Sequence, residues 1–206
     1  MARPFTQQER NRIRDRLMTE GKELFTRYGL QKTNVAELTE AAGIAKGSFY
    51  SFFPSKEALY FEIFRREEQQ LRERVVETLN PEEPLTRDRF RLFLKQAFRL
   101  IEENPFIRRI YLHEDYDRLI RGLPQEYHDE HTTEDIDYLR PLIERWQAGG
   151  NMIRKEPGII ISVIRALFVV TLHRDQLGEE YYPATVDLLI DCLATGLIPE
   201  GEQTDD

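Results

Sequence analysis

Cysteine is scarce in this chain, glycine and proline are no more than average, and each of these counts excludes a class of protein. The 206 residues hold one cysteine, 11 glycines and 10 prolines. Disulfide scaffolds need pairs of cysteines, and collagen-like or low-complexity chains need far more glycine or proline. The single cysteine fits a reducing compartment, so we expect a cytoplasmic protein.

Long apolar runs are missing as well. The longest apolar stretch, residues 159–172, is interrupted by Ser162, Arg165 and Thr171 and is too short to span a bilayer. The first 16 residues are polar and contain none of the apolar region that a secretory signal requires. We therefore expect neither a secretory signal nor a membrane partner.

Motifs of catalysis and metal binding are also absent. The sequence has no G-x-S-x-G, no P-loop and no H-E-x-x-H. His128 and His131 stand three residues apart in an acidic run, a spacing that could place two imidazoles on a metal but is more typical of a solvated surface. The sequence therefore predicts no enzyme, no cofactor and no metal site.

Charge is distributed unevenly along the chain. The net charge is −8, yet residues 1–60 carry 10 basic and 7 acidic side chains, a net charge of +3, and the remainder carries −11. A slightly basic segment on an acidic body favours a local contact with a polyanion over attraction by the whole molecule.

Helical signals follow one another along the whole chain. Thr6 and Glu9 have the spacing of a capping box, Asn34 and Ser55 precede apolar-periodic runs as N-cap residues, and Gly43 suits the end of a short helix. Apolar residues recur at helical spacing, and no alternating run predicts a strand. The sequence therefore predicts an all-α fold of about nine helices.

The expected helices divide the chain into two domains. An N-terminal three-helix domain covers residues 1–55, and a long connecting helix follows over residues 56–79. Residues 80–86 contain two prolines and two acids and are the best candidate for a linker. A second helical domain is expected over residues 80–206.

Two short helices around Gly43 are typical of a helix-turn-helix. The glycine can adopt a positive φ at the turn, and the second helix is expected over residues 45–52. Three aromatic side chains in and after that helix cannot all face solvent. Phe49 and Phe53 should therefore be buried, whereas Tyr50 should face the other way and offer its hydroxyl.

Residues 33–60, TNVAELTEAAGIAKGSFYSFFPSKEALY, resemble the helix-turn-helix signature of TetR-type transcriptional regulators. The resemblance covers roughly residues 9–65, and the length and helical content of the chain are similar to those of the family. It implies a DNA-binding N-terminal domain that contacts base edges near Lys46 and phosphates on either side. The implied DNA-binding residues are Thr33, Asn34, Lys46, Gly47, Ser48, Tyr50, Ser51 and Lys56.

Some positions depart from the family signature. Ala45 replaces the small polar cap before the recognition helix, a loss that typically costs about 1 kcal/mol. Phe52 stands where the family often has a histidine that contacts phosphate. Three arginines of the first helix either add contacts to the DNA backbone or form a solvated helix face, and the second interpretation is favoured: Arg10, Arg12 and Arg14.

The C-terminal helices are expected to dimerise. Pro141 should kink or restart a helix over residues 133–148, and two apolar helices follow over 158–176 and 183–197. In the family the last two helices pair with a second chain, so the resemblance implies a homodimer. Cys192, set among leucines, is expected to be a small buried side chain. The implied interface residues are Ile160, Val163, Ile164, Leu167, Val186, Leu189, Ile190 and Leu193.

Aromatic side chains are frequent between the linker and the last two helices. Ligand pockets in helical domains are mostly apolar, so we expect this region to enclose a small hydrophobic or amphipathic effector. Any single aromatic residue at helical spacing is nevertheless more often part of the core than a ligand contact. The candidate pocket residues are Phe90, Phe93, Phe106, Tyr111, Tyr116, Trp146 and Phe168.

The sequence thus predicts a ligand-responsive transcriptional regulator. In its simplest form this is a repressor that binds a palindromic double-stranded DNA operator as a homodimer and is released by a small-molecule effector. The alternative is a helical module that binds small molecules or proteins and whose helix-turn-helix no longer reads DNA. Ala45, Phe52 and the acidic body favour that alternative.

Overall fold

The computed structural model describes residues 5–79, 83–112, 119, 125–172 and 177–199, with side chains at all of these except 111–112, 125–135 and 170–172. These residues form eight α-helices and one 3-10 helix, with no strand among them, which confirms the predicted all-α class. The chain divides into two compact units. Residues 1–70 and 104–125 make the N-terminal unit, and residues 71–103 and 126–206 make the C-terminal unit.

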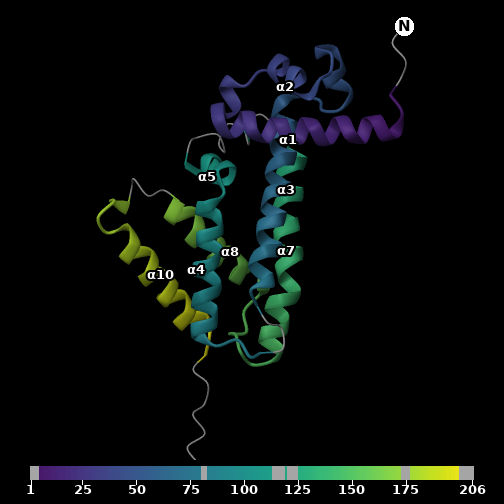
Figure 1. Ribbon diagram of the computed structural model, residues 1–206. Coiled ribbons are helices and arrows are strands. Elements are labelled where there is room, and N and C mark those ends of the chain that lie inside the picture. The colour runs from purple at the N-terminus through teal and green to yellow at the C-terminus, as the bar shows by residue number, and fades with distance from the viewer. Residues whose placement is uncertain (1–4, 80–82, 113–118, 120–124, 173–176, 200–206) are drawn as a thin grey trace, which may run out of the picture. The chain divides into compact units, whose positions relative to one another are not determined.

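The N-terminal unit contains four helical elements and the first part of a fifth. They are α1 (Gln7–Lys32), α2 (Val35–Ala42), the 3-10 helix η1 (Lys46–Ser51), α5 (Pro105–Leu112) and the start of α3 (Lys56–Glu77). α1 packs against α2 and α5, and α2 packs against η1 (Figure 1). The core between them is fully buried and consists of Leu17, Phe25, Leu38, Phe49, Leu59, Tyr60 and Phe64.

The predicted caps are present at both helices that precede the turn. Thr6 and Glu9 form a capping box at α1, since the Glu9 N–H donates to the Thr6 hydroxyl (3.2 Å) and the Thr6 N–H donates to the Glu9 carboxylate (2.7 Å). These hydrogen bonds, the backbone one foremost, lower the pKa of Glu9 below its usual value. Asn34 caps α2 in the same way, and Gly43 ends α2 in the left-handed region at φ 68°.

The segment around α5 packs with the N-terminal unit, although the division at residue 80 would assign it to the C-terminal domain. The Asn104 side chain caps α5 and also donates a hydrogen bond of 2.8 Å to Glu67, a buried carboxylate that pairs with Lys22 at 2.6 Å. Beyond this cap, Phe106 packs on Tyr60 with ring centroids 5.1 Å apart. Contacts between distant parts of the sequence therefore complete this unit.

The C-terminal unit is built from the end of α3 and four further helices. These are α4 (Arg87–Glu103), α7 (Gln125–Ala148), α8 (Pro157–Leu172) and α10 (Tyr182–Leu197), of which α10 packs against both α4 and α8 (Figure 1). α7 continues as one helix through Pro141, so the expected restart at that residue is wrong. No described helix is both long and apolar enough to cross a membrane.

Candidate functional site

The recognition element η1 is attached to the protein by one face and exposed on the other. Phe49 and Phe53 are buried, with 0% and 2% of their surfaces accessible, whereas 59% of Tyr50 is exposed. This confirms the predicted alternation of aromatic side chains. It follows that the buried rings anchor one side of η1, which packs against α2, while Lys46, Tyr50 and Ser51 face solvent.

Most of the predicted DNA-binding residues lie on this exposed face. Lys46, Gly47, Tyr50 and Ser51 are exposed, and Ser48 is half-buried. A Cβ atom at Gly47 would meet no other atom within 4 Å, so a DNA backbone or base edge could approach the chain closely there. The exposed Asn34 lies before α2, where its side chain accepts the capping hydrogen bond from Glu37.

Two of the predicted phosphate contacts are instead directed into the protein. Thr33 is fully buried, and its hydroxyl donates a hydrogen bond of 2.8 Å to the Gly29 carbonyl. Lys56 donates from its Nζ to three carbonyl oxygens at the end of α1, those of Leu30 at 2.6 Å, Thr33 at 2.9 Å and Gln31 at 3.4 Å. Thr33 is the C-cap of α1, and the Lys56 ammonium stabilises the same helix end, so both groups are engaged within the protein.

The arginines of α1 divide into two kinds. Arg10 donates to the Ser51 carbonyl at 2.8 Å, and Arg14 donates to the Phe52 carbonyl at 3.2 Å. Arg12, between them, is exposed. A uniformly solvated helix face was expected for all three and is wrong for Arg10 and Arg14. No local pattern could reveal these contacts, because 41 and 38 residues separate the partners along the chain.

The aromatic residues predicted to line an effector pocket are not gathered in one place. Phe90 and Phe93 pack edge-on against Trp146 in the core of the C-terminal unit, at ring distances of 6.5 and 6.2 Å. Phe106 belongs to the N-terminal unit, and Phe168 packs on Phe98. Tyr116 and the side chain of Tyr111 lie outside the described residues.

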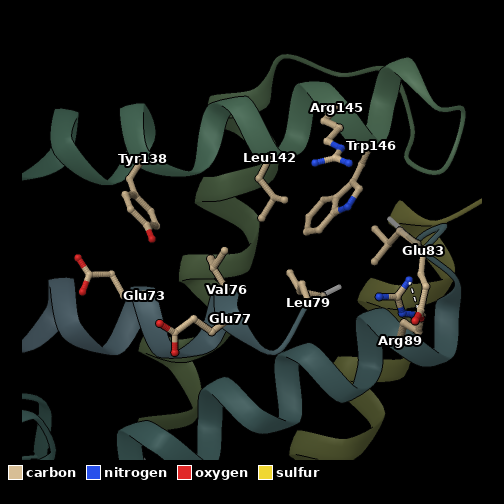
Figure 2. Close-up of a pocket in the computed structure, with 11 residues that line it drawn as sticks. Glu73, Val76, Glu77, Leu79, Glu83, Arg89, Tyr138, Leu142, Arg145 and Trp146 are labelled. Atoms are coloured by element: carbon tan, nitrogen blue, oxygen red, sulfur yellow. Dashed lines mark ion pairs between the residues drawn. The ribbon is translucent and has the colours of Figure 1, made fainter. Parts of the chain in front are cut away.

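A pocket of about 430 Å³ does lie in the C-terminal unit, between α3 and α7. Figure 2 shows Leu142 and Trp146 projecting from α7 toward Val76 of α3 and toward Leu79, two residues beyond the end of that helix. Of the predicted aromatic residues, Trp146 lines it. The helical spacing of the lining residues on α7 was a usable signal, since Tyr138, Leu142, Arg145 and Trp146 share one helix face. Charged groups surround the apolar lining: Glu73, Glu77, Glu83, Arg89 and Arg145.

The predicted interface residues fall into two groups. Val163 is exposed, and three residues of α10 are partly buried against the core, namely Val186, Leu189 and Leu193. The other four are buried within their own unit, so in this arrangement they cannot contact a second chain: Ile160, Ile164, Leu167 and Ile190. α8 is mostly apolar, with Ser162, Arg165 and Thr171 as its polar residues, so its sequence gives a weak signal of which face is buried.

α8 and α10 each carry apolar side chains that are exposed to solvent. α8 exposes Ile159, Val163 and Val169, and α10 exposes Leu188. Cys192 is exposed too, so its expected burial is wrong. It lies four residues after Leu188 on one face of α10, whereas Ile190, Ala194 and Leu197 form the buried face.

Metal ligands do not gather among the described residues, where no group of three or more suitable side chains occurs. The side chains of His128 and His131, which have a spacing compatible with metal binding, lie outside the described residues.

Comparison with known proteins finds relatives of the recognition region and of the whole fold. Residues 17–63 match the model of the bacterial regulatory proteins of the tetR family. The HTH-type transcriptional repressor NemR of Escherichia coli is 32% identical over 84 residues, which is 41% of this chain and 42% of NemR. The uncharacterized HTH-type transcriptional regulator YhgD of Bacillus subtilis is 21% identical over 157 residues, 72% of this chain and 76% of that protein.

A solved TetR-family regulator from Pectobacterium atrosepticum has the same fold. The TM-score is 0.73 at 20% identity, with 94% of this chain and 98% of that chain covered. The fold and the exposed recognition element define a helix-turn-helix protein. Residues 17–63 carry the signature of the TetR family of transcriptional regulators, and the chain has the fold of a solved member of that family.

Proposed function

We propose that this regulator is a repressor that binds a palindromic operator as a homodimer and leaves it when a small hydrophobic or amphipathic effector binds. The observation that carries the proposal is the exposed face of η1. Lys46, Gly47 and Tyr50 are open to solvent there, while buried Phe49 fixes the backbone that presents them. A short helix supported in this way can enter the major groove of DNA.

Each exposed residue of η1 has a distinct role in this proposal. The Lys46 ammonium and the backbone at Gly47 approach base edges or phosphates, because they lie at the N-terminal end of η1, where the backbone N–H groups favour anions. Ser48 and Ser51 add short hydrogen-bonding groups, and the Tyr50 hydroxyl donates to a phosphate. Phosphate contacts contribute affinity, and base contacts contribute sequence preference.

Exposed apolar side chains support the homodimer. Ile159, Val163 and Val169 on α8 and Leu188 on α10 would be removed from water by a second copy of the chain. A two-fold axis through these helices would supply two copies of η1. Recognition helices about 34–36 Å apart fit successive turns of one DNA face, so a palindromic operator follows.

The pocket between α3 and α7 supports control by an effector. Its apolar lining fits a hydrophobic body, and the charged side chains around it fit a polar end group (Figure 2). The release step requires that the effector bind the DNA-free arrangement more tightly than the DNA-bound one.

Selection from random duplex DNA tests operator binding. The full-length chain should enrich a palindromic sequence, and its affinity for that sequence should fall steeply as salt rises because bound phosphates release counterions. Lys46→Ala should weaken binding at every sequence, whereas a change at Ser48 should alter the preference among sequences. Failure to enrich any sequence would favour the alternative, a helical module that binds small molecules or proteins.

Intrinsic fluorescence tests the pocket, because Trp146 is the one tryptophan of the chain. Amphipathic molecules that release the selected DNA should also change Trp146 emission. Val76→Phe, which fills the pocket, should abolish both effects and leave DNA binding in the absence of effector unchanged. DNA release that persists in Val76→Phe without a change in Trp146 emission would place the effector elsewhere.

A further inference from the structure

We propose that Arg10 and Arg14, anchored by Glu62, act as an arginine clamp that fixes the orientation of η1 for sequence readout. The inference rests on the proposed DNA reading by η1 and names positioning residues that do not themselves touch DNA. It is carried by contacts at the C-terminal end of η1, the end away from Lys46.

η1 needs an external support because its own structure is weak. It is a 3-10 helix of six residues, a type with poorer hydrogen-bond geometry than the α-helix. Ala45 precedes it and forms no side-chain cap, so the first N–H groups of η1 gain no side-chain acceptor there. The buried rings of Phe49 and Phe53 anchor one side of η1. Because both rings lie on the same side, they oppose a rotation of η1 about that side only weakly.

Arg10 supplies the first half of the clamp. Its Nη2 donates a hydrogen bond of 2.8 Å to the Ser51 carbonyl, and its guanidinium lies 5.0 Å from the centre of the Phe52 ring. A cation at the C-terminal end of a helix opposes the partial negative charge of the last carbonyls. The ring of Phe52, which departs from the family signature, thus has a cation–π partner within the protein.

Arg14 supplies the second half and connects it to α3. Its Nη1 donates to the Phe52 carbonyl at 3.2 Å, its Nη2 pairs with the Glu62 carboxylate, and its guanidinium lies 4.5 Å from the centre of the Phe53 ring. The planar guanidinium can donate hydrogen bonds to the Phe52 carbonyl and to the Glu62 carboxylate at the same time. A lysine carries a single ammonium nitrogen and cannot reproduce this geometry. Glu62 therefore holds Arg14 at the angle that meets η1.

Burial distinguishes the clamp from a set of phosphate contacts. Arg10 and Arg14 are half-buried and both direct N–H groups to main-chain carbonyls, whereas Arg12 is exposed. Arg12 lies on the same helix, carries the same charge and is separated from each clamp residue by one position. It is the matched control for any effect of charge alone.

Two measurements on the full-length chain test the clamp. The first, without DNA, is hydrogen exchange of the backbone amides of residues 46–53. Exchange should become about ten-fold faster in Arg14→Ala, Arg14→Lys and Glu62→Gln, because loosening of η1 by about 1.4 kcal/mol changes the open fraction ten-fold. Arg12→Ala should leave it unchanged. Glu62→Gln alters neither η1 nor the arginines and serves if Arg14→Ala does not fold.

The second measurement compares two DNA duplexes, the sequence selected by the wild-type chain and a scrambled duplex of equal composition. Arg14→Lys should lose at least ten-fold in affinity for the selected duplex, with the scrambled duplex and the salt dependence unchanged. Loss of a phosphate contact would instead weaken both duplexes equally and reduce the salt slope by about 0.9 for each lost contact.

The outcomes separate the clamp from the proposed function. Unchanged exchange in all clamp variants, or equal weakening of both duplexes with a shallower salt slope, overturns the clamp. If the wild-type chain selects no DNA sequence, the proposed function fails, and the exchange measurement still decides whether Arg14 and Glu62 hold η1.

Discussion

The two units of the molecule present surfaces of opposite chemistry. Around η1, cationic side chains satisfy backbone carbonyls, and the exposed residues include Lys46, Tyr50 and Ser51. α10 forms ion pairs to α4 such as Arg91–Asp191, and α8 and α10 together expose isoleucine, valine and leucine side chains. The first surface suits a charged polymer whose phosphates need hydrogen-bond donors. The second suits an apolar partner, since burial in protein would remove those side chains from water.

The largest expected effect comes from placing a charge on the apolar surface. Leu188→Glu should convert the proposed dimer to a monomer, because 64% of Leu188 is exposed in the single chain and the carboxylate would be buried without a partner in that dimer. Affinity for the selected palindrome should fall by more than 100-fold, since the two half-sites would bind independently. Sedimentation velocity and DNA titration measure the two results.

Leu92→Glu is the matched control for that substitution. Leu92 is 67% exposed, but it lies on α4 and not on the proposed interface. The variant should remain dimeric and bind DNA as the wild-type chain does. A dimer that survives Leu188→Glu, or dissociates equally in both variants, would contradict the proposed interface.

Two lysines of the N-terminal unit should give opposite results. Lys46→Met should weaken DNA binding and reduce the salt slope without changing the free energy of unfolding, because the side chain is exposed. Lys56→Met should reduce the free energy of unfolding by about 2 kcal/mol, because three carbonyls at the end of α1 lose a charged donor.

Urea unfolding and salt-dependent DNA titration of the two variants separate these results. If Lys56→Met keeps wild-type stability and reduces the salt slope, its ammonium contacts phosphate as the sequence predicted, and the structural role assigned to it is wrong.

The smallest expected effect is a pH dependence shared by both units. The pKa of Glu9 is lowered by hydrogen bonds from Thr6, of which the one from the backbone N–H has the largest effect. The pKa of Glu156, at the start of α8, is lowered chiefly by a hydrogen bond from the backbone N–H of Gly158. A carboxylate whose pKa is lowered by folding stabilises the folded state at pH values above its ordinary pKa of 4.5. This contribution to the free energy of unfolding is lost as the pH falls through the folded-state pKa. Both helix ends should therefore loosen only below pH 4.5.

Carboxyl carbon chemical shifts followed by NMR from pH 6 to pH 2 measure these pKa values directly. Glu9 and Glu156 should both titrate below 4.5. A midpoint at or above that value for either residue would show that its capping hydrogen bonds are not formed in solution.

Local signals explain what could be predicted from the sequence. The caps at Thr6 and Asn34, the turn at Gly43 and the burial of Phe49 each depend on residues within a few positions of one another, so pattern and propensity were sufficient. The family signature is likewise confined to one continuous segment, so the sequence alone indicates the recognition region.

The remaining features depend on contacts between distant residues. Thr33 and Lys56 were expected on phosphates because nothing local indicates that they meet at the end of α1. The outward faces of α8 and α10 could not be assigned, because an apolar helix leaves its orientation to the neighbours it meets. Most of the residues that line the pocket come from α3 and α7, whose pairing no motif indicates.

The docking of residues 104–112 on the N-terminal unit has a practical consequence for fragment design. A fragment that ends at residue 79 would include the whole family signature but would lack Phe106, which covers Tyr60, and Asn104, which binds Glu67. It would also lack Arg109, whose guanidinium occupies the space that any side chain at Gly29 would need. An isolated recognition domain should therefore carry α5, joined for instance through a short flexible connection that replaces α4.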